Sequence, residues 1–192
     1  MPYPAQIDAE RIVDKAGEMV EAEGADRFSL HKLAAALGVK APSLYRYFDG
    51  RADLLRALNL RTAQQMVTAM EEAASKGGDA RAKMLAMAQA CRDFGLDNPV
   101  RYTMAFTNAN PELRPDEALL EALAIPLQEI MAEISGPARS LAALRGLWAL
   151  IHGFILFELS GQLRRGGDLE RDFVQSVEAY LNGWSQEIDW AA

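Results

Sequence analysis

Residues 27–51 constrain the fold more than any other part of this chain of 192 residues. Ser29 suits the N-cap of a helix, and Gly38 suits the left-handed position that follows a helix. The apolar residues between them have helical spacing on one face: Leu30, Leu33, Ala34 and Leu37. Pro42 then favours the first turn of a second helix, where its missing N–H would have no partner. The stretch therefore predicts two short helices joined by a tight turn.

The second helix has an apolar face and a polar face. Leu44 and Phe48 are four residues apart and can bury against the first helix. The remaining side chains then point largely outward: Ser43, Tyr45, Arg46 and Tyr47. Helices this short need a scaffold. An apolar stripe before Gly24 predicts that scaffold: Ile12, Val13, Ala16, Met19 and Val20.

Charge is distributed unevenly along the sequence. The whole chain carries a formal charge of −7, which argues against a generally basic nucleic-acid-binding protein. Residues 27–51 contain five Lys or Arg and one acidic residue, whereas residues 52–192 contain 13 Lys or Arg and 19 Asp or Glu. A cationic helix pair on an acidic body suits a protein that meets phosphates with one end. The alternative is a solvated helical hairpin in an ordinary all-α protein.

The same stretch resembles the N-terminal DNA-binding domain of the TetR family of transcriptional regulators. The resemblance covers about residues 8–60 and rests on one ordered set: Ser29, Leu33-Ala34, Gly38-Val39, Leu44-Tyr45, Phe48, Arg51 and Asp53-Leu54. Two residues depart from the family pattern. Arg51 stands where Lys is usual, and Tyr47 stands where His is common.

The resemblance implies a helix-turn-helix that lays its second helix in the major groove of DNA. It places one set of residues on the phosphate backbone: Ser29, Tyr45, Tyr47 and Arg51, with His31 as a further candidate. It places a second set at the groove and its rim: Lys40, Ala41, Pro42, Ser43 and Arg46. Of these, Arg46 and Lys40 can donate to guanine. The alternative for Tyr45 is a core aromatic, and for His31 a solvated histidine.

Helical periodicity continues through the rest of the chain and predicts an all-α fold of about nine helices. We expect a DNA-binding domain at residues 1–52 and a regulatory domain at 53–192. The expected helices span about 51–75, 79–97 and 138–165, with others from 98, from 115 and from 168 to 187. Pro126 predicts a kink or break.

Composition favours a cytoplasmic protein without a cofactor. The single cysteine, Cys91, excludes an internal disulfide and a cysteine-rich zinc site. We expect no metal site and no membrane span, because the longest apolar run, residues 147–157, is short for a bilayer. The N-terminus shows no signal-peptide pattern.

The C-terminal part predicts an apolar cavity for a small-molecule effector. Its candidate lining residues are Met84, Met87, Cys91, Phe94, Tyr102, Phe106, Trp148 and His152. The alternative is that all eight belong to an ordinary core. The segment around Trp148, His152 and Gly153 also resembles the Trp-His-Gly type of C-terminal domain found in part of the TetR family.

The last helix carries an apolar stripe that is large for the end of a monomer. We expect it to pair across a twofold axis through Phe173, Val177, Tyr180, Leu181 and Trp184. The alternative is that the stripe packs only within its own domain. A homodimer would place two helix-turn-helix units on a near-palindromic operator in double-stranded DNA.

Three functions remain open on the sequence. The first is a transcriptional repressor that a small apolar ligand releases from DNA. The second is a constitutive DNA-binding protein without a ligand. The third is a small all-α enzyme, although the sequence contains no nucleophile elbow, phosphate-binding glycine loop or paired acid and base.

Overall fold

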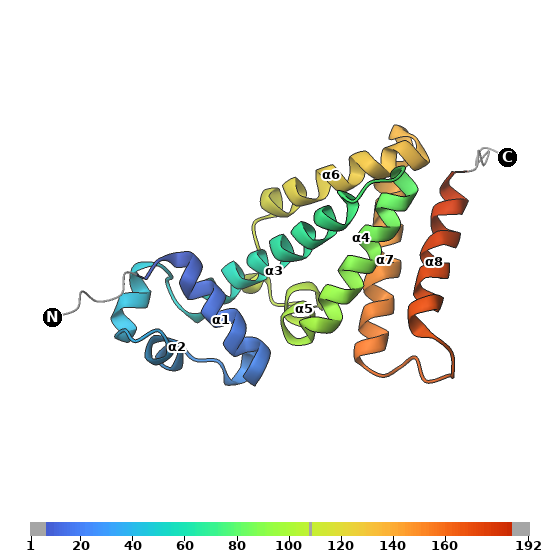
Figure 1. Ribbon diagram of the computed structural model, residues 1–192. Coiled ribbons are helices and arrows are strands. Elements are labelled where there is room, and N and C mark those ends of the chain that lie inside the picture. Colours follow the sequence, from blue (N-terminus) through green and yellow to red (C-terminus); the bar gives the residue numbers. More distant parts are fainter. Residues whose placement is uncertain (1–6, 108, 186–192) are drawn as a thin grey trace. The chain divides into compact units, whose positions relative to one another are not determined.

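The computed structural model describes residues 7–107 and 109–185, and this part of the chain is helical without strands (Figure 1). Its α-helices are α1 (Ala9–Glu23), α2 (Leu30–Ala36), α3 (Arg51–Ala74), α4 (Ala80–Asp97), α5 (Pro99–Thr107), α6 (Glu117–Ser135), α7 (Ser140–Leu159) and α8 (Leu169–Trp184). A six-residue 3₁₀ helix, η2 (Ala41–Arg46), makes nine helices in the described part. Three shorter 3₁₀ turns are η1 (Ala25–Arg27), η3 (Pro111–Leu113) and η4 (Pro137–Arg139). The predicted all-α fold is confirmed.

The chain forms two compact units. Unit 1 combines Met1–Gln65 with Asn98–Leu120, and unit 2 combines Met66–Asp97 with Glu121–Ala192. Helix α3 therefore begins in unit 1 and ends in unit 2. Unit 1 is larger than the segment 1–52 that the sequence predicts as the DNA-binding domain, because it also contains most of α3, all of α5 and η3, and the start of α6.

The core of unit 1 holds the helix-turn-helix against α1 and α3. Ile12 and Val20 of α1, Leu33 of α2 and Leu54 of α3 are all fully buried in it. This is the scaffold that the apolar stripe of residues 12–20 predicts. A side-chain hydrogen bond fixes the start of α1: the Asp8 carboxylate accepts the Arg11 backbone N–H at 2.7 Å and so caps the helix.

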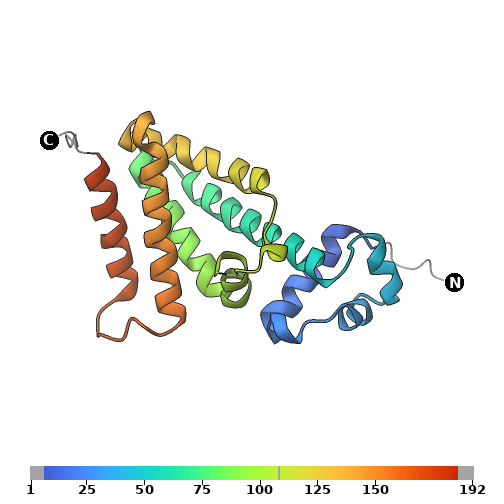
Figure 2. The same cartoon turned by 180° about the vertical axis from the view of Figure 1, so that it is seen from behind.

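Unit 2 contains a layer of three long helices. Helices α4, α7 and α8 lie side by side in both views (Figures 1 and 2), and each of the three packs on the other two. Its core residues come from all of them, with Met87 on α4, Ile155 on α7 and Val177 on α8 completely covered. One ion pair crosses this layer: Arg92 of α4 donates to Glu158 of α7 at 2.9 and 2.7 Å.

Two helix boundaries differ from the sequence-based expectation. Helix α6 continues through Pro126 without a break. The proline removes a bond to the Ala122 carbonyl, but Ala122 is exposed, so water can satisfy that carbonyl. Helix α7 ends at Leu159 and not near residue 165. Gly161 has φ +64°, and the Gln162 N–H donates to the Phe157 carbonyl at 2.8 Å, which closes the helix in a Schellman motif.

The remaining boundaries agree with the expected spans to within a few residues. For α8, the expected end near residue 187 lies outside the described residues. The stretch Pro137–Leu159 has the length and mean hydropathy, 1.6, of a membrane span, although the apolar run that we judged from the sequence is shorter. One face of it packs on α4 and α8 in unit 2, and the hydropathy of a single helix is weak evidence for a membrane span.

Candidate nucleic-acid interface

The turn between α2 and η2 has the geometry that its sequence predicts. The Ser29 hydroxyl accepts the Lys32 N–H at 3.3 Å and caps α2. Gly38 has φ +69°, a conformation that costs a residue with a Cβ about 1–2 kcal/mol. The Val39 N–H donates to the Ala34 carbonyl at 2.9 Å and completes the turn. These bonds set the direction in which the second helix leaves.

The second helix is 3₁₀ rather than α over its whole length. Its turns close between residues three apart, as in the bond from the Ser43 N–H to the Lys40 carbonyl at 2.9 Å. Short helices commonly take this form. Leu44 and Phe48 are buried in the core of unit 1, with 1% and 8% exposure, and the sequence predicts this burial. The other face of η2 is therefore open.

That open face carries the side chains that could contact DNA. Tyr45 is 54% exposed, and Arg46, Pro42 and Lys40 are also exposed. Ala41 and Ser43 are half-buried on the same short helix. We call these six residues, Lys40, Ala41, Pro42, Ser43, Tyr45 and Arg46, the η2 surface. His31 is exposed on α2. The alternative of a core position for Tyr45 is excluded by its exposure.

Tyr47 and Arg51 have partners within unit 1. The Tyr47 hydroxyl donates to the carbonyl of Ile7, two residues before the start of α1, at 2.6 Å. The Arg51 guanidinium donates to the Ala25 carbonyl at 2.6 Å and to the Phe28 carbonyl at 3.4 Å. Both side chains remain exposed, yet each already positions a neighbouring segment. Their role as phosphate contacts stays a prediction.

Two further cations of the basic stretch were not assigned a role from the sequence. Arg27 is exposed just before α2, while Lys32 pairs with Glu23 at 2.8 Å. Only Arg27 therefore adds to the candidates for phosphate contact. The sequence feature that includes Arg27 is the positive charge of residues 27–51. This charge gives the number of cations but does not show which way each side chain points.

The structure divides the eight candidate effector-binding residues between the two units. Unit 2 contains Met84, Met87, Cys91, Phe94, Trp148 and His152, whereas Tyr102 and Phe106 lie on α5 in unit 1. Met84, Met87 and Cys91 are fully buried core residues. Tyr102 and Phe106 contact each other, with ring centroids 4.9 Å apart. The effector-binding role of all eight residues stays a prediction.

Trp148 and His152 are one helical turn apart on α7. Their rings contact each other edge to face, with ring centroids 4.5 Å apart. Burial lowers the pKa of His152 from 6.5 to about 4. The imidazole is therefore neutral at pH 7 and offers one donor and one acceptor. This is the kind of polar group that orients a ligand in a mostly apolar site.

Three residues of the predicted dimer stripe are core residues instead. Phe173, Val177 and Leu181 have at most 1% exposure, because α8 turns this face toward α4 and α7 of its own unit. Tyr180 and Trp184 are half-buried, and the Tyr180 hydroxyl donates to the Ala143 carbonyl at 2.8 Å. Burial raises the pKa of Tyr180. The large exposed apolar side chains of this layer lie on α7: Leu141 at 44% and Phe157 at 56%.

The fold and this surface define a class of protein. A helix-turn-helix with an exposed second helix, carried by a larger all-helical chain, is the arrangement of a helix-turn-helix DNA-binding regulator. Family comparisons agree. Residues 12–58 match the family described as "Bacterial regulatory proteins, tetR family", and residues 84–180 match "Tetracyclin repressor-like, C-terminal domain". The chain belongs to the TetR family of transcriptional regulators, and the Trp-His-Gly subtype is not confirmed.

Individual relatives cover nearly the same length. The HTH-type transcriptional regulator Rv0681 of Mycobacterium tuberculosis is 32% identical in an alignment 181 residues long, which covers 89% of this chain and 78% of the relative. A protein of unknown function from Rhodococcus sp. RHA1 has a similar fold, with a TM-score of 0.80, 23% identity and coverage of 97% and 100%. A TetR variant from Acinetobacter baumannii AYE, solved with minocycline, has a TM-score of 0.68, 23% identity and coverage of 93% and 96%.

Proposed function

We propose that this regulator is a repressor that binds operator DNA through the η2 surface and is released by a small, largely apolar ligand. The observation that carries the DNA-binding face is the exposure of Tyr45 and Arg46 on a helix fixed by the Gly38 turn. In this arrangement Arg46 and Lys40 donate to base edges, and Ala41 or Pro42 packs on a thymine methyl. The hydroxyls of Ser29 and Tyr45 contact phosphates, with His31, Tyr47 and Arg51 beside them.

We further propose that the chain acts as a homodimer on a near-palindromic operator in double-stranded DNA. Two copies of the η2 surface about one helical turn of DNA apart would meet two half-sites. The exposed Phe157 and Leu141 on α7, together with the half-buried Tyr180 and Trp184, support a surface between copies in unit 2. A protein with this role works in the cytoplasm beside its DNA, and we assign it no catalytic activity, metal or cofactor.

The effector site is proposed in unit 2, around the neutral His152 and Trp148. The minocycline complex of the A. baumannii TetR variant supports a small organic molecule as the kind of effector, because that protein has a similar fold. Release requires that the ligand bind one state of the dimer more tightly than the other. A constitutive DNA-binding protein is the second candidate, and the tight packing of Met84, Met87 and Cys91 favours it. Release of bound DNA by an added small molecule would distinguish the two.

The DNA-binding face is tested with two exposed substitutions. We expect Arg46→Ala to weaken binding to the DNA upstream of the protein's own gene by at least about fivefold, since a good base contact contributes about 1–3 kcal/mol. Tyr45→Ala should weaken the same binding several-fold, because it removes a phosphate contact. Thr68→Ala, at an exposed position of α3 within unit 2, is the matched control and should bind normally. Gel-shift titration measures the affinity, and sedimentation confirms that the assembly is intact. Wild-type affinity in both variants would refute the assigned face.

A further inference from the structure

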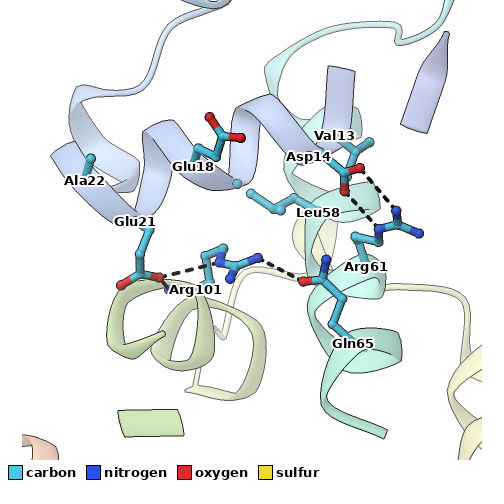
Figure 3. A pocket seen from close by; sticks show the side chains of 10 residues that line it. Val13, Asp14, Glu18, Glu21, Ala22, Leu58, Arg61, Gln65 and Arg101 are labelled. Atoms are coloured by element: carbon cyan, nitrogen blue, oxygen red, sulfur yellow. Dashed lines mark hydrogen bonds and ion pairs between the residues drawn. The ribbon is translucent and has the colours of Figure 1, made fainter. Parts of the chain in front are cut away.

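Unit 1 contains a groove that the DNA-binding surface does not use. It lies between α1, α3 and α5 and has a volume of about 580 Å³, within the range of small-molecule sites (Figure 3). All of its lining residues belong to unit 1, so it is separate from the effector site proposed in unit 2. We call it the α1 groove.

The floor of the α1 groove is apolar and closely packed. Val13 and Leu58 lie on it, and both are buried. Gly17 allows α1 to approach α3, because a Cβ at this position would lie 3.2 Å from the Leu58 Cδ1 atom. The floor therefore offers a firm apolar surface for the body of a ligand rather than a loose gap that side chains could fill.

Two ion pairs form the walls of the groove, and within each pair the two charges cancel. Asp14 accepts from both Nε and Nη2 of Arg61, at 3.0 and 3.2 Å. On the other side, Glu21 accepts the backbone N–H groups of Val100 and Arg101 at 3.0 Å each, which ties α1 to the start of α5. The Arg101 guanidinium lies between Glu21 and Gln65, as Figure 3 shows. These four charged side chains leave no net charge.

Glu18 is the remaining charged side chain of the groove. Its partner is Lys15, at 2.5 Å, and Lys15 is not part of the groove lining. The Glu18 side chain is 67% exposed, and exposed pairs of this kind contribute little free energy. A ligand cation can therefore share or replace Lys15 at little cost. The groove as a whole presents, above an apolar floor, one carboxylate whose partner lies outside the lining.

We propose that the α1 groove is a binding site for a small organic cation, with an amine or amidine on Glu18 and an apolar body over Val13 and Leu58. The site goes beyond the proposed function and does not depend on DNA binding. A cation is favoured over an anion because the two arginines are paired with side chains of the groove itself, whereas Glu18 is 67% exposed and its partner Lys15 lies outside the lining. The apolar part of the bound ligand would contact both α1 and α3.

Three probes of the same shape test the charge preference: benzamidine, benzamide and benzoate. We expect the full-length protein to bind benzamidine at least tenfold more tightly than benzoate, with benzamide between them, as measured by calorimetry or ligand-observed NMR without DNA. Equal binding of the three probes, or binding of benzoate alone, would overturn the proposal.

Two variants locate the site. Glu18→Gln should weaken benzamidine binding about threefold, whereas Glu10→Gln, which is on the same helix but outside the groove lining, should not. Ala22→Trp should block the groove, and Ala9→Trp is its control at an exposed position of α1. Circular dichroism checks that each variant is folded, and Glu18→Gln decides the question if Ala22→Trp is not. Unchanged benzamidine binding in Glu18→Gln would contradict the assigned site.

Discussion

The charge state of His152 follows from its burial in unit 2. The folded protein holds the imidazole in a mostly apolar environment, which lowers its pKa to about 4, while the unfolded chain has the ordinary value of 6.5. Between these pH values the unfolded state binds more protons than the folded state. The free energy of unfolding therefore falls as the pH falls from 6.5 to 4, by at most about 1.4 kcal/mol per pH unit from this residue.

Replacing His152 removes this dependence. We expect His152→Gln to reduce the slope of unfolding free energy against pH in that window, as measured by urea denaturation at several pH values. His31→Gln is the control, since His31 is exposed on α2. If the two variants show the same slope as the wild type, His152 is not held neutral by burial.

The element α2–η2 depends on one backbone conformation. Gly38→Ala should destabilise unit 1 by about 1–2 kcal/mol, because φ is +69° there and no atom lies within 4 Å of the added Cβ to produce any other effect. Gly166→Ala also meets no atom within 4 Å and has no strained φ, so it should change stability by less than about 0.5 kcal/mol. Thermal unfolding measures both. Equal stability of the two variants would contradict the role of the turn.

Local chemistry explains which elements could be predicted from the sequence. Ser29, Gly38 and the apolar spacing between them each act over a few residues, so the helix-turn-helix and the exposure of Tyr45 follow from local rules. The end of α7 was misplaced because the arginines after Leu163 suit the C-terminus of a helix, whereas Gly161 closes the helix earlier. The continuity of α6 through Pro126 is compatible with the exposure of Ala122, which no local pattern reveals.

The candidate sites were less predictable because they depend on which helix covers which face. Phe173, Val177 and Leu181 form an apolar stripe whether they meet α4 and α7 or a second chain, and only the packing of unit 2 shows that they are core. In the same way, the sequence brings Tyr102 and Phe106 into one set with Met84, whereas the structure assigns them to different units. The partners of Tyr47 and Arg51 are carbonyls distant in sequence, and spacing gives no signal for them.

At the scale of the whole molecule, the proposed dimer places a requirement on α7. Phe157 is 56% exposed, so Phe157→Glu should leave the subunit folded and shift the dimer toward monomer. Ile125→Glu is the matched control, because Ile125 is 49% exposed on α6. Sedimentation velocity over a range of concentrations measures the assembly. A dimer of unchanged stability in Phe157→Glu would move the proposed interface away from this face of α7.

The most direct test of the account is the salt dependence of DNA binding by the wild-type protein. The central claim is that a locally basic surface on an acidic chain binds the DNA backbone, so binding should release several counterions. Fluorescence anisotropy with the DNA upstream of its own gene should show the logarithm of the affinity falling steeply and linearly with the logarithm of salt concentration. Affinity that does not change with salt, or no binding even at low salt, would contradict the claim.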